Sequence, residues 1–224
     1  MRTGRTTDGP LVVSGANGVL ELLRSGATVE RLLLGDGPRR AELLAEGRRR
    51  GLVAVDADRA TLDRIAGRPG HQGAVAVAAP FRYASLETIA ESRSPLVLVL
   101  DNVQDPRNLG ALLRTARAAG AGGVVLPRDR SVGVTSVVAV ASAGTLFGLP
   151  IVRVPNLVRA MNSLKAFGFW LVGLVPSSPA VSSTSTPRTG WPWWWAAKAP
   201  GSGSSSNGRA ISRSRSRWPP GSSP

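Results

Sequence analysis

The 224-residue chain contains no cysteine and a single histidine, His71. Disulfides and thiolate metal sites are therefore excluded, and one histidine gives too few ligands for an ordinary zinc site. No apolar run approaches the roughly 20 residues of a membrane span, and the arginine-rich N-terminus lacks the apolar core of a signal peptide. We therefore expect no metal, no membrane partner and a cytoplasmic location.

Acidic residues are also scarce. The chain has 14 Asp and Glu against 28 Lys and Arg, of which 26 are arginine, and its formal net charge is +14. A field of this sign attracts polyanions, which makes nucleic acid the partner that composition favours. A genome rich in G and C would produce the same arginine content, so composition alone leaves both explanations open.

Periodicity and composition divide the chain into four segments. Residues 1–83 alternate helix and strand signals and predict a small α/β domain, in which Ser14 or Asn17 caps the first helix. Residues 84–94 are interpreted as a linker. Residues 95–174 alternate strands and helices again, which predicts a parallel sheet with helices on both faces. Residues 175–224 hold no Asp or Glu, fourteen serines and five of the six tryptophans, and are expected to be a disordered low-complexity tail.

The stretch 100–119, LDNVQDPRNLGALLRTARAA, carries the densest polar chemistry. It follows an apolar run typical of a buried parallel strand and turns through Asp105 into a helix that offers Arg107, Asn108 and Arg114. Ligand sites of α/β proteins lie where a strand ends and a helix begins. A structural role is the alternative, because an asparagine at a helix start is usually an N-cap and an arginine on a helix usually faces solvent.

The pattern D-x-x-x-D-P-x-N-x-G-x-x-x-R in this stretch resembles motif 1 of the SpoU/TrmH family of RNA ribose 2′-O-methyltransferases. The resemblance continues at residues 142–144, 149–151, 156–157 and 169–174. Near the N-terminus, SGANGVLELL and the His71-Gln72-Gly73 strand entry resemble the family's substrate-binding domain. Within the family, residues 11–174 look most like the 23S rRNA guanosine-2′-O-methyltransferases.

This resemblance implies an enzyme that transfers a methyl group from S-adenosylmethionine to a ribose 2′-OH of ribosomal RNA. It implies an L30e-like substrate-binding domain, a Rossmann-like parallel sheet of the SPOUT type with a C-terminal trefoil knot, and a homodimer. By resemblance Arg114 would hold the neighbouring phosphate and favour the developing alkoxide, and Asn108 would orient the ribose. Arg107, His71 and Gln72 would contact RNA, although the last two could instead only shape the strand entry.

Three motifs of the family's cofactor pocket are absent after Leu174: a G-x-E-G-x-G turn, an Ile-Pro segment and a Ser-Leu-Asn motif. We therefore assign no cofactor-binding residue and expect an incomplete knot, an exposed sheet edge and poor solubility. One alternative is a catalytically inactive RNA-binding fragment that cannot bind S-adenosylmethionine. Another is a Rossmann-like nucleotide-binding domain, which is disfavoured because no G-x-G-x-x-G follows a strand.

The tryptophans of the tail indicate a possible origin for these absences. Tryptophan has one codon, TGG, so the segment 190–200, GWPWWWAAKAP, fixes much of its own DNA. Taking each codon's third base with the next two bases gives a peptide compatible with L-A-L-V-V-G-x-E-G-x-G, the missing strand and turn. We hypothesise a single frameshift between about residues 173 and 182.

Overall fold

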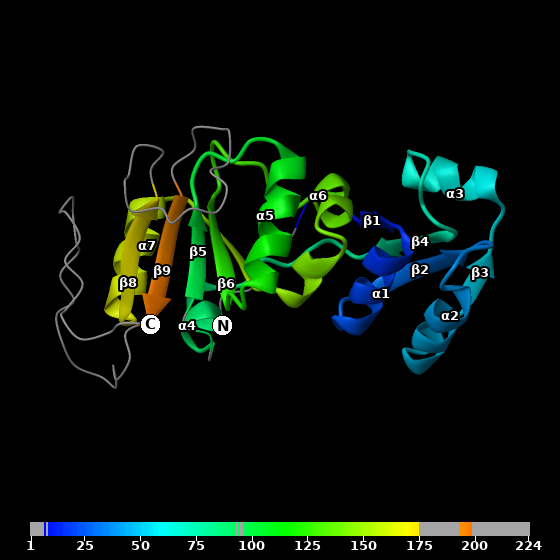
Figure 1. Ribbon diagram of the computed structural model, residues 1–224, viewed down its shortest axis with the longest axis horizontal. Coiled ribbons are helices and arrows are strands. Elements are labelled where there is room, and N and C mark those ends of the chain that lie inside the picture. Colours follow the sequence, from blue (N-terminus) through cyan, green and yellow to red (C-terminus); the bar gives the residue numbers. More distant parts are fainter. Residues whose placement is uncertain (1–6, 8, 93, 95, 175–192, 199–224) are drawn as a thin grey trace, which may run out of the picture.

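The computed structural model describes residue 7 and residues 9–92, 94, 96–174 and 193–198. Figure 1 shows two sheets at opposite ends of an elongated molecule, with α5 and α6 between them. Among the described residues, no helix has both the length and the apolar character needed to cross a bilayer.

The N-terminal half is a four-stranded sheet with the order β1-β4-β2-β3 and three helices. β4 pairs antiparallel with both β1 and β2, and β2 pairs parallel with β3. The alternating strand and helix signals predicted this α/β architecture. Its elements are β1 (Leu11–Ser14), α1 (Ala16–Arg24), β2 (Val29–Leu34), α2 (Arg40–Arg49), β3 (Ala54–Asp56), α3 (Arg59–Ala66) and β4 (Ala74–Ala78).

The predicted cap of α1 is wrong. Gly15 occupies the N-cap position and contributes no side-chain cap, while Ser14 ends β1. Asn17 lies inside the helix, and its Oδ1 accepts a hydrogen bond from Arg39. The first helical N–H group, that of Ala16, donates instead to Oε1 of Gln72 at 3.3 Å. A residue brought near by the fold therefore satisfies an N–H group that local residues leave open.

The C-terminal half is a five-stranded sheet with the order β7-β6-β5-β9-β8. β5, β6 and β7 are parallel, as predicted, whereas β9 runs antiparallel to both β5 and β8. Its strands are β5 (Leu96–Leu100), β6 (Gly123–Pro127), β7 (Ile151–Val154), β8 (Phe169–Leu174) and β9 (Trp193–Lys198). Its helices are α4 (Leu86–Ala90), α5 (Pro106–Ala118), α6 (Ser136–Ala141), the 3₁₀ helix η1 (Thr145–Gly148) and α7 (Leu157–Ala166).

Helices cover both faces of this sheet around β5, which confirms the predicted layering. Val97 and Val99 belong to a buried cluster with residues of α4 and α7. Leu98 and Leu100 belong to the cluster that contains the buried face of α5. Successive side chains of a strand point to opposite faces, so burial on both faces explains the continuous apolar sequence of β5.

The tail contains a strand that its sequence did not predict. Residues 175–224 were expected to lack regular structure, and this expectation is wrong for β9. The segment WWWAAK lacks the alternation of a half-buried strand, and it forms a strand by backbone pairing with β5 on one side and β8 on the other. The other residues of the tail, 175–192 and 199–224, lie outside the described residues, and so does the C-terminal knot that we expected to be incomplete.

The two halves are joined by more than a linker. The segment predicted as a linker contains α4, and Ala84 forms a bridge to Val152 of β7. The N–H of Val12 in β1 donates to Oγ of Ser136 at the start of α6, at 2.9 Å. The largest buried cluster contains residues of both halves. The halves therefore share one core.

Candidate functional site

The helix of the candidate site, α5, begins directly after the loop that follows β5. Asp105 is its N-cap, and the carboxylate Oδ1 accepts the N–H of Arg107 at 2.8 Å. Pro106 stands at the first helical position, where its missing N–H costs nothing. Because Asp105 caps the helix, the structural role that sequence alone allowed for Asn108 is already filled.

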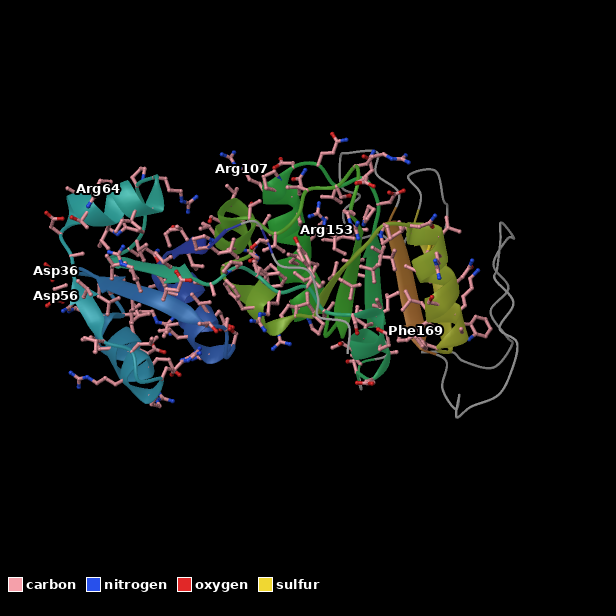
Figure 2. The ribbon with its side chains drawn as sticks, turned by 180° about the vertical axis from the view of Figure 1, so that it is seen from behind. Asp36, Asp56, Arg64, Arg107, Arg153 and Phe169 are labelled. Atoms are coloured by element: carbon pink, nitrogen blue, oxygen red, sulfur yellow. The ribbon has the colours of Figure 1, made fainter. Side chains whose placement is uncertain are left out.

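The three predicted site residues of α5 have exposed side chains without a partner among the described residues. Among the described residues, none forms a hydrogen bond or ion pair with the side chain of Arg107, Asn108 or Arg114. At 3.6 residues per turn, Arg107 and Arg114 lie within about 20° of each other around the helix, whereas Asn108 lies about 120° from Arg114. Figure 2 shows Arg107 projecting from the start of α5. The two arginines therefore lie in one stripe along the helix, and Asn108 lies about a third of a turn away from it.

The loop after β5 is held by the loop between β6 and α6, residues 128–135, which we call the β6–α6 loop. The N–H of Val103 donates to Oγ of Ser131 at 3.1 Å, and the N–H of Val132 donates to the Val103 carbonyl at 2.8 Å. The neighbouring Asn102 has a φ of +56°, a left-handed conformation that asparagine tolerates better than most residues. The N–H and the carbonyl of Val103 are thus both hydrogen-bonded to the β6–α6 loop, which fixes the turn that leads into α5.

Gly110 allows the close packing of α5 against α6. A Cβ atom at this position would lie 2.9 Å from the Ser142 nitrogen and still closer to Cβ of Ala141. In the structure it is the end of α6 that makes the approach.

His71 and Gln72 lie in the N-terminal half and make structural contacts. His71 is buried, its Nδ1 accepts the N–H of Gly73 at 3.0 Å, and its Nε2 lies 3.4 Å from Oδ1 of Asp63. Gln72 bonds the start of α1. These contacts favour the alternative that both residues shape the entry to β4, and their contact with RNA stays a prediction.

Tyr83 and Arg153 were not singled out by sequence, yet both contact the β6–α6 loop. Oη of Tyr83 accepts the N–H of Val134 at 2.8 Å. Nη2 of Arg153 donates to the carbonyl of Arg128 at 2.8 Å, and its guanidinium carbon lies 5.8 Å from the centre of the Tyr83 ring. The available signal was a charged residue inside an otherwise apolar strand, IVRV.

Two surface cavities formed by described residues lie away from α5. One, of about 360 Å³, is lined by Asp36, Arg40, Asp56 and their neighbours at the ends of β2 and β3. The other, of about 410 Å³, lies between Ser25, Phe81 and Phe147. Neither includes a residue of α5 or of the loop after β5.

Both halves of the chain match known protein families. The family model described as RNA 2′-O ribose methyltransferase substrate binding matches residues 12–84. The model of the SpoU rRNA methylase family matches residues 95–192. A protein of Staphylococcus haemolyticus assigned to the TrmH family of tRNA/rRNA methyltransferases is 35% identical over 171 residues, which cover 73% of this chain and 68% of the relative. The chain therefore belongs to the SpoU/TrmH family of RNA methyltransferases.

Solved structures of the same family resemble this fold. An AdoMet-bound rRNA methyltransferase from Sinorhizobium meliloti superposes with a TM-score of 0.56 at 27% identity, covering 69% of this chain and 58% of that one. The SpoU methyltransferase AviRb from Streptomyces viridochromogenes, in complex with AdoMet, gives a TM-score of 0.52 at 27% identity, covering 70% and 60%. The match thus spans less than two thirds of these structures.

Proposed function

We propose that the chain transfers a methyl group from S-adenosylmethionine to a ribose 2′-OH of RNA, and that α5 supplies the residues that contact the nucleotide. The observation that carries this proposal is that Asp105 caps α5 and leaves the exposed side chains of Asn108 and Arg114 without a partner among the described residues. Family membership supports the reaction class. A guanosine of 23S rRNA as the target, a homodimer and a cytoplasmic location are further parts of the proposal, and they rest on the resemblance.

Arg114 has the chemistry to hold the phosphate beside the reactive ribose. A guanidinium offers several N–H donors in a fixed plane and keeps its charge, so it binds a phosphate and stabilises negative charge that develops on a neighbouring oxygen. Arg107 shares the stripe of Arg114 and would contact the backbone further along the strand. The Asn108 amide, with one donor side and one acceptor side, would orient the ribose.

Neither of the two cavities described above offers the methyl donor a pocket beside α5, so α5 would supply only the RNA side of the proposed site. S-Adenosylmethionine supplies the methyl group, and a nucleoside cofactor of this size needs a concave pocket with a few convergent polar groups. Both cavities described above lie elsewhere, and the buried polar side-chain atoms without a partner among the described residues are Asp63 Oδ1 and Arg153 Nε. We therefore assign no cofactor-binding residue. Residues 175–192, across which the family match continues, lie outside the described residues.

The proposal is tested by incubating the 224-residue chain with a 23S rRNA transcript and S-adenosylmethionine carrying a labelled methyl group. We expect label in RNA at a linkage that resists alkaline cleavage, because a 2′-O-methyl group blocks attack by that oxygen. Replacing Arg114 with alanine should lower the rate by about 100-fold, the usual cost of removing one donor to developing charge. Arg117→Ala is the matched control, since Arg117 is also exposed on α5 but lies one turn further on.

The alternative is an RNA-binding protein without methyl transfer. RNA binding that weakens with salt, combined with no labelled RNA, would support that alternative and overturn the proposal. Equal losses in Arg114→Ala and Arg117→Ala would remove the specific role of Arg114 while leaving the reaction class in place.

A further inference from the structure

The β6–α6 loop determines the position of the turn that leads into α5. Its Ser131 and Val132 bond the N–H and the carbonyl of Val103, respectively. Val103 lies two residues before the N-cap of α5 and next to the left-handed Asn102. A displacement of the β6–α6 loop would therefore move the residues from which α5 starts.

Both ends of the β6–α6 loop are held by hydrogen bonds to the side chains of Arg153 and Tyr83. At its start the Arg128 carbonyl accepts a hydrogen bond from Arg153, and at its end the N–H of Val134 donates to Oη of Tyr83. Tyr83 is 6% exposed. The Arg153 guanidinium lies 5.8 Å from the Tyr83 ring centre, a distance at which a cation is attracted to an aromatic ring. The two side chains thus support each other as well as the loop.

The residue before Val134, Gly133, lies against the same two side chains. A Cβ atom on Gly133 would be 2.9 Å from both Nη1 of Arg153 and Oη of Tyr83. Glycine is the residue that allows the backbone to approach this closely. The loop therefore contacts Tyr83 and Arg153 at residue 128 and again at residues 133–134.

Both supporting residues are anchored on β7. Arg153 is part of β7, and the residue after Tyr83, Ala84, donates its N–H to the Ile151 carbonyl of the same strand at 2.8 Å. Tyr83 itself belongs to the segment that connects the two halves of the chain. The connecting segment and β7, a strand separated from β9 by β6 and β5, thus reach the loop beside α5.

We propose that Tyr83 and Arg153 are positioning residues of the candidate site, which hold the β6–α6 loop so that it fixes the turn at Val103 and the start of α5. This inference rests on the proposed function for its catalytic consequence. Its structural part concerns the chain without RNA or methyl donor, so the two can fail separately.

The structural part is tested by hydrogen–deuterium exchange on the full chain in three variants. Tyr83→Phe removes only the hydroxyl that accepts the Val134 N–H, and Arg153→Met removes the donor to the Arg128 carbonyl. Arg159→Met is the control, because it makes the same change as the second variant at an exposed position of α7. We expect exchange at Val103 and Val132 to accelerate at least about fivefold in the first two variants, because each loses a loop hydrogen bond. It should not change in the third, and Arg153→Lys should restore part of the protection.

Exchange at Leu33, deep in β2, reports global unfolding and separates a loosened loop from an unfolded chain. Unchanged exchange at Val103 and Val132 in both variants, or equal acceleration at Leu33, would overturn the proposal. In the methylation assay we expect kcat to fall about tenfold in Tyr83→Phe with KM within twofold. A rise in KM alone would assign Tyr83 to RNA binding instead. A parent chain that transfers no methyl group contradicts the proposed function, and the exchange result still decides whether the loop is held.

Discussion

Some residues of α5 contact other parts of the protein, whereas others have side chains without a partner among the described residues. Gly110 meets the end of α6, and Asp105 bonds the helix start. Arg107, Asn108 and Arg114 have exposed side chains without partners among the described residues. A helix face that is fixed by packing and carries free donors on the other side is suited to binding a ligand without rearrangement.

Gly110→Ala tests the packing of α5. Alanine gains about 1 kcal/mol of helix propensity over glycine. The new methyl group would meet Ala141 and the Ser142 backbone, and overpacking of this kind costs about 1–3 kcal/mol. We expect a net loss of about 1 kcal/mol in the free energy of unfolding, measured by urea denaturation.

Gly148→Ala is the control for this change. Its new methyl group would lie 3.4 Å from the flexible guanidinium of Arg117, an ordinary contact, so its stability should stay within about 0.5 kcal/mol of the parent. Equal stability of the Gly110 and Gly148 variants would show that α5 can move away from α6 at little cost.

Among the elements, β8 forms an apolar edge of the C-terminal sheet. Phe169 and Leu171 pack against the cluster that contains α7, whereas Trp170 and Val172 on the opposite face are each 53% exposed. Unpaired strand edges with exposed apolar side chains promote association between molecules. Low solubility therefore stays a prediction, and β8 is the element on which we expect it to depend.

Trp170→Lys should therefore reduce self-association. A lysine on an edge strand is a common natural protection against edge-to-edge pairing, and the replaced side chain is half exposed, so little burial is lost. We expect a smaller apparent mass in sedimentation at high protein concentration. Val137→Lys adds the same charge on α6, where Val137 is 47% exposed, and should have a smaller effect. If both variants act equally, net charge rather than the β8 edge controls association.

At the scale of the whole molecule, the halves share a core but the family's cofactor motifs are absent from the chain. The match to the solved relatives covers about 58–60% of their length. The bases that encode β9 are also those whose shifted translation yields V-V-G of the missing strand and turn. The frameshift hypothesis therefore makes a prediction about binding.

Calorimetric titration should show markedly weaker binding of S-adenosylmethionine to the 224-residue chain than to a variant whose tail is translated in the shifted frame. The physical reason is that a nucleoside needs convergent polar groups in a pocket, and the shifted frame supplies the turn that the present tail lacks. Equal affinities of the two chains would contradict this, because the present tail would then complete a pocket as well as the shifted one does. Resequencing the gene provides an independent check on the reading frame.

The sequence by itself determined the α/β class, the parallel β5, β6 and β7, the family, and the stretch from which the candidate residues come. These features depend on near neighbours: apolar periodicity defines a strand or helix, and motif 1 places Asn108 and Arg114 within one helix. Which side chains of α5 are exposed can be predicted from the helical repeat, because the apolar positions of the helix mark its buried face.

Tertiary structure alone decided which distant residues meet. Gln72 caps a helix start 56 residues earlier, Tyr83 bonds an N–H group 51 residues later, and Trp193–Lys198 enters the sheet between β5 and β8. No sequence window contains both partners of such a contact. A backbone N–H group accepts any suitable oxygen, so the path of the whole chain determines which one it finds.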